Sequence, residues 1–264
     1  MASQKLDTLI NEIKKLDLDE LSETRIKQGV ISRILNGLGW DTFNISEVIM
    51  EHSVGTMRVD YALHISNDKK VFIEAKSGSE KLENHQEQLL NYSFKEGVRL
   101  SILTNGETWW FYLPLESGNW EHRRFYSINI KGQSTEVISR KFIDFLAKEK
   151  VEDGTAIENA ETALKSRKRK DTVSKTLPTA WERIITEPDE LLVELLLDKT
   201  EEICGYRPDS KEVQDFLKTI SFEEKKKPHQ PEKIKIKKPY KPKKDDVKLH
   251  EFSGSKEFIL EDLA

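Results

Sequence analysis

The stretch Val71-Phe72-Ile73-Glu74-Ala75-Lys76 places an acid and a lysine two residues apart on an otherwise apolar strand. Because strand side chains alternate between the two faces of a sheet, Glu74 and Lys76 project together, and Ile73 and Ala75 point the other way. A carboxylate and an ammonium in a buried strand are costly unless they pair or bind a ligand. This stretch is therefore the first place to look for chemistry.

The segment before this strand supplies a second acid, Asp60. Residues 58–65 read as a strand, and Asn67-Asp68 suits a tight turn into the next one, so Asp60 is expected to face Glu74 or Ala75. Two carboxylates about 5 Å apart repel each other unless a cation lies between them. Mg²⁺, or Mn²⁺ in its place, prefers such oxygen ligands, and Asp60, Glu74 and the backbone carbonyl of Ala75 are the predicted set.

A hydrolytic role follows for Lys76, which would orient or help to deprotonate a metal-bound water. A structural interpretation stays open beside it. In a chain with 34% charged residues, an Asp followed later by Glu-x-Lys arises easily by chance. Glu74 would then form a salt bridge with Lys76 or a neighbouring residue.

The surrounding sequence predicts an α/β core with a mixed sheet flanked by helices, a restriction-endonuclease-like arrangement. Apolar spacing predicts a helix over residues 4–18 and a second one that begins at Ser22, the expected N-cap. Asn105-Gly106 predicts a hairpin turn, and the aromatic run over residues 109–112 is expected to fill the core rather than stack on bases. The remaining expected elements are strands over 45–51, 58–65, 71–75, 98–104, 107–113 and 120–130, and helices over 82–94 and 137–148.

Composition divides the chain further. We expect a nuclease-like domain over residues 1–150, a polar and basic linker over 151–175, a helical subdomain over 176–222 and a flexible Lys/Pro-rich tail over 223–264. Residues 225–248 hold eleven lysines and three acids, whereas the whole chain carries a net charge of −4. Such asymmetry is typical of a basic arm beside a folded body, which either contacts DNA or serves as a linker.

Several classes of protein are excluded. No apolar run approaches the roughly 20 residues that a membrane span needs, and the N-terminus lacks the apolar core of a signal peptide, so we expect a cytoplasmic protein. The single cysteine, Cys204, excludes an internal disulfide framework and a cysteine-based zinc site. His52, His64, His85 and His122 show no metal-ligand spacing. The chain has no G-x-x-x-x-G-K-[S/T] phosphate loop, hence no predicted ATP site.

Across residues 23–113 the chain resembles the N-terminal nuclease domain of type I restriction enzyme R subunits, a branch of the PD-(D/E)xK superfamily. The order and spacing of the matching pieces are more specific than any one of them. The pieces are Glu23, Leu38-Gly39-Trp40-Asp41, Arg58-Val59-Asp60-Tyr61-Ala62-Leu63, Ile73-Glu74-Ala75-Lys76, Gln88-x-x-x-Tyr92, and Thr104-Asn105-Gly106 followed by aromatics.

The resemblance implies a Mg²⁺-dependent endonuclease that cuts DNA, with Asp60, Glu74 and Lys76 as catalytic residues. It implies that Gln88 and Tyr92, on one helix face, support the site, and that Glu23 contacts the metal through water. A second copy or other restriction subunits are the expected protein partners. Two departures stand out: the translocase motif is absent, and Val59 replaces the proline of the superfamily signature. The alternative function is a DNA-binding or adaptor module that cleaves only with a partner or not at all.

Overall fold

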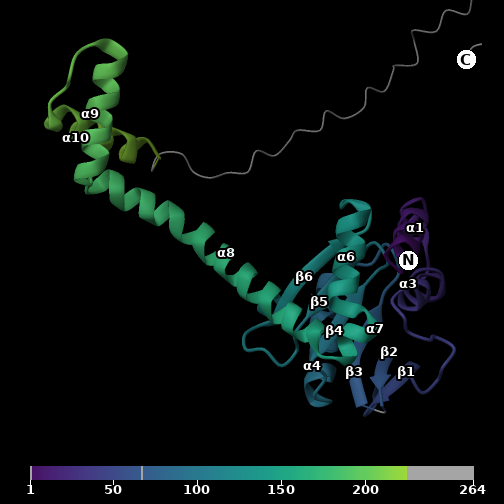
Figure 1. Ribbon diagram of the computed structural model, residues 1–264. Coiled ribbons are helices and arrows are strands. Elements are labelled where there is room, and N and C mark those ends of the chain that lie inside the picture. Colours follow the sequence, from purple (N-terminus) through teal and green to yellow (C-terminus); the bar gives the residue numbers. More distant parts are fainter. Residues whose placement is uncertain (1, 67, 225–264) are drawn as a thin grey trace, which may run out of the picture. The chain divides into compact units, whose positions relative to one another are not determined.

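The computed structural model describes residues 2–66 and 68–224, and it divides after Trp181 into two compact units. Most of the tail predicted for residues 223–264 therefore lies outside the described residues, as does Asn67 of the predicted turn. The first unit contains a sheet with helices on both faces (Figure 1). The described part of the second, residues 182–224, contains helices alone.

The described residues form one six-stranded sheet in the order β1-β2-β3-β4-β5-β6. Only β3 and β4 run parallel; each of the other neighbouring pairs is antiparallel. The predicted mixed sheet of an α/β protein is thereby confirmed. The strands are β1 (Val48–Val54), β2 (Met57–Ile65), β3 (Asp68–Ala75), β4 (Leu100–Thr104), β5 (Thr108–Tyr112) and β6 (Arg124–Asn129).

The second predicted helix begins at Ser22 as expected, and the Ser22 side chain accepts a hydrogen bond from the Arg25 amide. Residues 23–37, in α2, η2 and α3, are called the N-terminal helical segment. One turn of this segment, η2, is a π-helix, a rarity that often marks functional sites. The helical elements of the first unit are α1 (Ala2–Lys14), η1 (Leu18–Glu20), α2 (Glu23–Ile26), η2 (Lys27–Ile31), α3 (Ser32–Gly37), η3 (Leu82–His85), α4 (Gln86–Lys95), α5 (Trp120–Arg123), α6 (Thr135–Leu146), α7 (Lys148–Glu152) and most of α8 (Thr155–Thr186).

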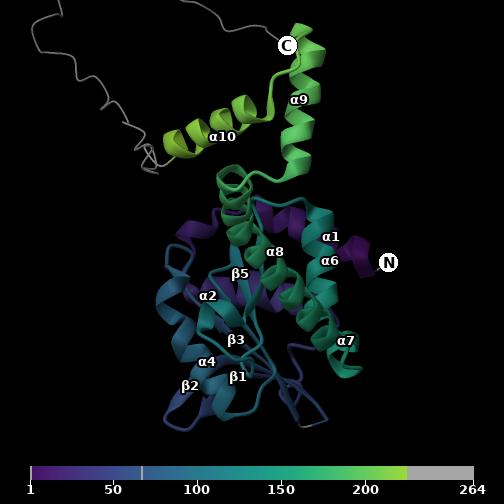
Figure 2. The same ribbon diagram turned by 90° about the vertical axis from the view of Figure 1, so that its left-hand side faces the viewer.

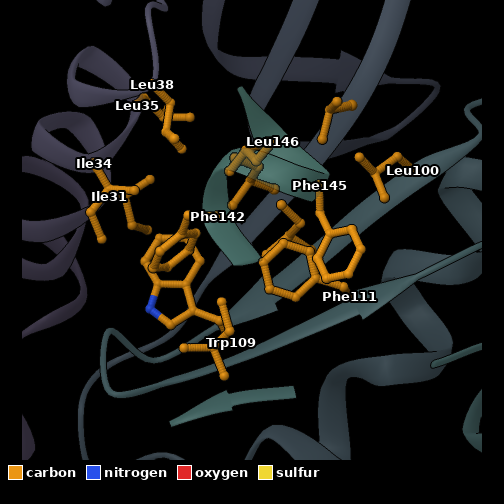
Figure 3. Packing of buried hydrophobic residues seen from close by; sticks show 14 of the residues in the cluster. Ile31, Ile34, Leu35, Leu38, Leu100, Trp109, Phe111, Phe142, Phe145 and Leu146 are labelled. Carbon is orange, nitrogen blue, oxygen red and sulfur yellow. The ribbon is translucent and has the colours of Figure 1, made fainter. Parts of the chain in front are cut away.

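Both faces of the sheet are covered, and α4 and α6 lie on opposite sides of it (Figure 2). On the face of α6, Trp109 and Phe111 pack against Phe142 and Phe145 in the larger core (Figure 3). Trp110 and Tyr112 are buried in the smaller core, beneath η3 and α4. All four aromatics of the predicted run are therefore core residues, divided between the faces by strand alternation.

Two segments differ from the sequence prediction. The strand expected over 120–130 begins with the short helix α5, because the Asn119 side chain caps the His122 amide; β6 starts only at Arg124. The connector expected over 151–175 is largely helical, in α7 and α8. The composition of this segment is mostly polar, but it includes a narrow apolar stripe. Ala156, Ala160 and Leu164 form this stripe and are buried in the larger core.

The second unit is built from α9 (Glu190–Cys204), α10 (Ser210–Glu224) and the end of α8. Its small core consists of Ile185, Val193, Leu197, Val213 and Leu217. Gly205 ends α9 with φ of 77°, a left-handed conformation that suits glycine at this position. In the part of the chain that the structure describes, no helix is long and apolar enough to span a membrane.

Candidate active site

The point where β2 and β3 separate positions the first candidate residue. The strands pair up to Tyr61↔Ile73, and Asp60 follows just beyond this pair. There the Asp60 Oδ2 atom accepts a hydrogen bond of 2.7 Å from the Ala75 amide. The Asp60 side chain thus accepts a hydrogen bond from β3 at the point where backbone pairing between the two strands ends. The predicted register, with Asp60 facing Glu74 or Ala75, matches this geometry.

Glu74 and Lys76 share a face of β3 and the residues that follow it. Lys76 Nζ lies 2.7 Å from Glu74 Oε1, so the ion pair left open as a structural interpretation is present. The pair is largely buried, with 14% of the lysine side chain and 9% of the glutamate side chain exposed. The second carboxylate oxygen, Glu74 Oε2, is buried without a hydrogen-bond partner. One buried acceptor of the site therefore remains available to a ligand.

The loop after β3 is fixed by its neighbours, which holds Lys76 in place. The Lys76 amide donates to the Thr104 carbonyl at 2.8 Å. The Asn105 side chain donates to the Gly78 carbonyl at 3.0 Å, and the Gly78 amide donates to the Leu21 carbonyl at 3.0 Å. The predicted Asn105-Gly106 turn thus joins β4 to β5 and also supports the loop that carries Lys76.

Lys27 is a member of this site that the sequence reasoning missed. Its ammonium lies 2.9 Å from Glu23 Oε1 and 3.0 Å from Glu51 Oε1, and it also forms an ion pair with Asp60. The Tyr61 hydroxyl donates to the Lys27 carbonyl at 2.9 Å, which ties η2 to β2. The spacing of Glu23 and Lys27, four residues apart on a helix, was the available signal in the sequence.

Glu51 is a second member that the sequence did not reveal. It lies in β1 between the paired positions Met50↔Tyr61 and His52↔Val59, which places it across from Asp60. Its φ of 51° is a left-handed conformation that residues other than glycine seldom adopt. Such strain is concentrated at functional sites, and here it accompanies a carboxylate that reaches Lys27. No motif or spacing marks this conformation.

Burial and charge shift the pKa of each central group. Burial raises the pKa of the Asp60 carboxyl, against the opposing hydrogen bonds from Lys27 and the Ala75 amide. Burial also raises the pKa of Glu74, and the charge of Asp60 adds to the effect. For Lys27 and Lys76, burial favours a lower pKa, but their carboxylate partners outweigh it and raise the pKa of both. Two mutually repelling acids are thus held together by two lysines.

The carboxylate oxygens of the cluster are suitable ligands for a divalent metal ion. Among residues 2–66 and 68–224, no three His, Cys, Asp or Glu side chains are grouped so as to hold a metal. Mg²⁺ needs only one or two carboxylates, since it retains several waters. Asp60 and the unpartnered Glu74 Oε2 provide two such oxygens. The four acids and two lysines of the cluster carry a formal charge of −2, which one divalent cation would neutralise.

The predicted supporting pair lies on α4. Tyr92 is buried, and its hydroxyl donates to the Met57 sulfur at 2.8 Å. Burial raises the pKa of Tyr92; a hydrogen bond with Gln88 opposes the rise and the charge of Glu74 adds to it. Gln88 itself is exposed. The structure thus brings Tyr92 and Gln88 together near Glu74, and Glu23 joins the cluster through its ion pair with Lys27.

Two histidines lie closer together than their sequence spacing suggests. His52 on β1 and His64 on β2 lie with their ring centroids 5.8 Å apart, although the sequence spacing does not suggest a pair. They lie on paired strands, but the register places His52 opposite Val59 and not opposite His64. His85 lies elsewhere, 2.7 Å from Glu80. Within the described part of the chain these histidines form no metal-binding group.

Fold and cluster define the class: an α/β protein with a mixed sheet and a buried carboxylate–lysine site where two strands separate. Residues 45–120 match the family model of the type I restriction enzyme R protein N terminus. The match covers Asp60, Glu74, Lys76, Gln88 and Tyr92 and confirms the resemblance there, whereas Glu23 and residues 38–41 lie outside it. No curated protein and no solved structure matches the chain.

Proposed function

We propose that this protein is a metal-dependent DNA endonuclease of the restriction type, which hydrolyses phosphodiester bonds. The observation that carries the proposal is the buried Asp60 and Glu74 carboxylates, paired with Lys27 and Lys76 respectively, inside the segment that matches the R protein N-terminal family. Buried acids of raised pKa that each have a specific cation partner are typical of functional sites. DNA is then the substrate, and the cytoplasm is the compartment in which the protein meets it.

In this proposal Asp60 and Glu74 hold Mg²⁺ or Mn²⁺, together with the Ala75 carbonyl and, through water, Glu23. When bound, such a metal activates water and stabilises charge on the phosphodiester in the transition state. Asp60 is oriented for this task by the Ala75 amide, and Lys76 is oriented by Glu74 Oε1. The Lys76 ammonium then donates a hydrogen bond that positions the attacking water. Tyr92 and Gln88 support the same face of the site.

Lys27 has a positioning role in this proposal. Its ammonium offsets one of the three negative charges of Asp60, Glu23 and Glu51 at one edge of the cluster. The lysine thus offsets charge that a single divalent ion would otherwise have to balance alone. This arrangement favours a site with one metal ion over a site with two.

Plasmid nicking tests the proposal. Supercoiled DNA is incubated with the full chain and Mg²⁺ or Mn²⁺, alongside the variants Asp60→Asn, Glu74→Gln and Lys76→Met. Each variant should lose cleavage by about 10²-fold or more, since each removes a group acting on the transition state. Glu47→Gln is the matched control, because Glu47 is a largely buried glutamate paired with Lys148 at 2.8 Å outside the cluster. If all three variants cleave as the control does, the assignment is wrong.

A second candidate function is a DNA-binding or adaptor module that cleaves only with a partner or not at all. The observation that favours it is the ion pair of Lys27 with Asp60, which already satisfies one predicted metal ligand. Restriction subunits or a second copy would then complete the site. Metal-independent DNA binding without cleavage of supercoiled, linear, single-stranded or modified DNA would select this alternative.

A further inference from the structure

A second site lies within the first unit, away from the carboxylate cluster. It is a cavity of about 840 Å³ bounded by β6, α6 and the first half of α8. None of the residues of the carboxylate cluster lines it. Four cationic side chains and one acid do: Arg124, Lys141, Arg167, Lys170 and Asp144. The cavity therefore carries a formal charge of +3.

Aromatic rings contact two of these cations, Arg124 and Lys141, and Lys141 also has a carboxylate partner. The Arg124 guanidinium lies 4.4 Å from the centroid of the Trp110 ring. Lys141 Nζ lies 5.1 Å from the Phe145 ring centroid and 3.1 Å from Asp144. A cation–π contact fixes a cation without neutralising its charge. Within residues 2–66 and 68–224, Arg124 and Lys170 have no ion-pair partner among the salt bridges that the structure forms.

The elements around the cavity are joined to one another, which holds Arg124 and Arg167 in place without a ligand. The Arg167 guanidinium donates to the carbonyls of Glu121 and Arg124, which joins α8 to the start of β6. Asn159 donates to the Asp144 carbonyl at 3.0 Å, which joins α8 to α6. A cavity formed from three anchored elements is largely preorganised, as small-molecule sites usually are.

The rest of the lining suits a planar ring. Tyr126 contributes a partly exposed aromatic ring, whereas Phe125 and Phe145 are almost fully buried, and Ser127, Asn159 and Thr162 contribute a few polar groups. Cavities of several hundred Å³ with mostly apolar walls and a few polar groups are typical of ligand sites. Cationic groups that lack carboxylate partners call for an anion, and phosphate is the anion that arginine recognises best.

We propose that this cavity binds a nucleotide, with its phosphates on Arg124 and Lys170 and its base against the partly exposed Tyr126 ring. Two sources share this chemistry: a free mononucleotide, and a nucleotide within a single nucleic-acid strand. The site is distinct from the proposed nuclease site, because no residue contributes to both. Its occupation is therefore independent of whether the protein cleaves DNA.

Isothermal titration calorimetry on the full chain in EDTA tests the proposal, since EDTA prevents cleavage. The ligands are ATP, inorganic tripolyphosphate, adenosine and an eight-residue oligothymidylate. ATP or the oligonucleotide should bind more tightly than tripolyphosphate and adenosine, because each of the latter lacks one half of the ligand. Tighter binding of ATP identifies the free nucleotide, and tighter binding of the oligonucleotide identifies the strand.

Two variants and a matched control connect binding to the cavity. Arg124→Gln and Lys170→Glu should each weaken nucleotide binding about tenfold, the loss of one charge-assisted contact. Lys165→Glu is the control, because Lys165 is exposed on the same helix and does not line the cavity. Lys170 is exposed, so its replacement should leave folding intact even if Arg124→Gln does not fold.

Three results would overturn the proposal. One is an absence of binding by both ATP and the oligonucleotide. Another is equal binding of tripolyphosphate and ATP, which would indicate a site for polyanions only. The third is an equal loss of affinity in Lys165→Glu and Lys170→Glu, which would indicate surface charge rather than the cavity. The variant Asp60→Asn should bind the nucleotide as the unmodified chain does, so failure of the proposed nuclease function leaves this test unaffected.

Discussion

Lys27 forms an ion pair with Asp60 across the boundary between the N-terminal helical segment and the sheet. The same ammonium contacts Glu23 and Glu51. A helix residue thereby balances the charge of carboxylates contributed by β1, β2 and α2. This relationship couples the predicted nuclease site to the packing of the helices upon it.

The first prediction concerns removal of that cation. Lys27→Met should destabilise the metal-free protein by about 2 kcal/mol, because Asp60 then remains buried without its counter-ion. Mg²⁺ should restore more stability to the variant than it adds to the unmodified chain, since the metal no longer competes with an ammonium for Asp60. Urea unfolding in EDTA and in Mg²⁺ measures both effects.

Lys70→Met is the control, because Lys70 pairs with Asp68 near the protein surface. Such pairs contribute little to stability, and this variant should change the free energy of unfolding by less than about 1 kcal/mol. Equal responses of the two variants to Mg²⁺ would contradict competition between Lys27 and the metal.

The second prediction concerns Glu74. Burial and the nearby charge of Asp60 raise the pKa of this carboxyl, so its ionised form opposes folding. Relief of the repulsion from Asp60 should offset the lost charge pair with Lys76, so Glu74→Gln should change the stability of the metal-free protein little, while it abolishes the rise in Tm on addition of Mg²⁺. Differential scanning calorimetry with and without Mg²⁺ checks both. A variant that is less stable without metal, or that keeps the full Mg²⁺ response, would argue for a purely structural ion pair with Lys76.

Local patterns in the sequence were sufficient to predict most of the fold. The alternation of residues 71–75, the Ser22 cap and the Asn105-Gly106 turn each specify their element through short-range chemistry, and the structure contains all three. The capping of α5 at Asn119 was missed, because the helix is a single turn that precedes a strand. The helical start of α8 was missed because alanines form much of its buried stripe.

The candidate site was predictable only in part. The relation of Asp60 to Glu74 follows from the pairing of two apolar strands, whose register shifts by one residue between Leu63 and His64. Lys27 joins the site through tertiary packing, and Glu51 joins it with an unusual φ. Neither feature produces a periodic pattern in the sequence. The cavity beside β6 likewise depends on where α8 packs, and the sequence alone places its cations on separate elements.

The third prediction concerns the basic segment 225–248, which lies outside the described residues. If its lysines bind phosphates, deletion of residues 225–264 should weaken DNA binding similarly on all sequences. The slope of log K against log salt should also become shallower, by about 0.9 for each phosphate that is no longer neutralised. Fluorescence anisotropy between low and moderate salt measures the slope. An unchanged slope would leave the segment as a linker.

The fourth prediction concerns Gly78, in the loop that carries Lys76. A Cβ atom at this position would lie 1.7 Å from the Leu18 carbonyl oxygen and 2.8 Å from the Asp19 Cα. Both are backbone atoms that cannot rotate away, so Gly78→Ala should displace the loop and cost about 3 kcal/mol of stability. Cleavage should fall together with stability, because the Gly78 amide and carbonyl hold the chain that follows Lys76.

Gly29→Ala is the matched control. Nothing lies within 4 Å of a Cβ built at Gly29, which sits in the helical turn η2. Alanine favours a helix over glycine by about 0.5–1 kcal/mol, so this variant should be as stable as the unmodified chain or more stable. Chemical unfolding and plasmid nicking of both variants separate the two effects. If Gly78→Ala unfolds at the same denaturant concentration as Gly29→Ala, the loop is not held against η1 as the structure describes.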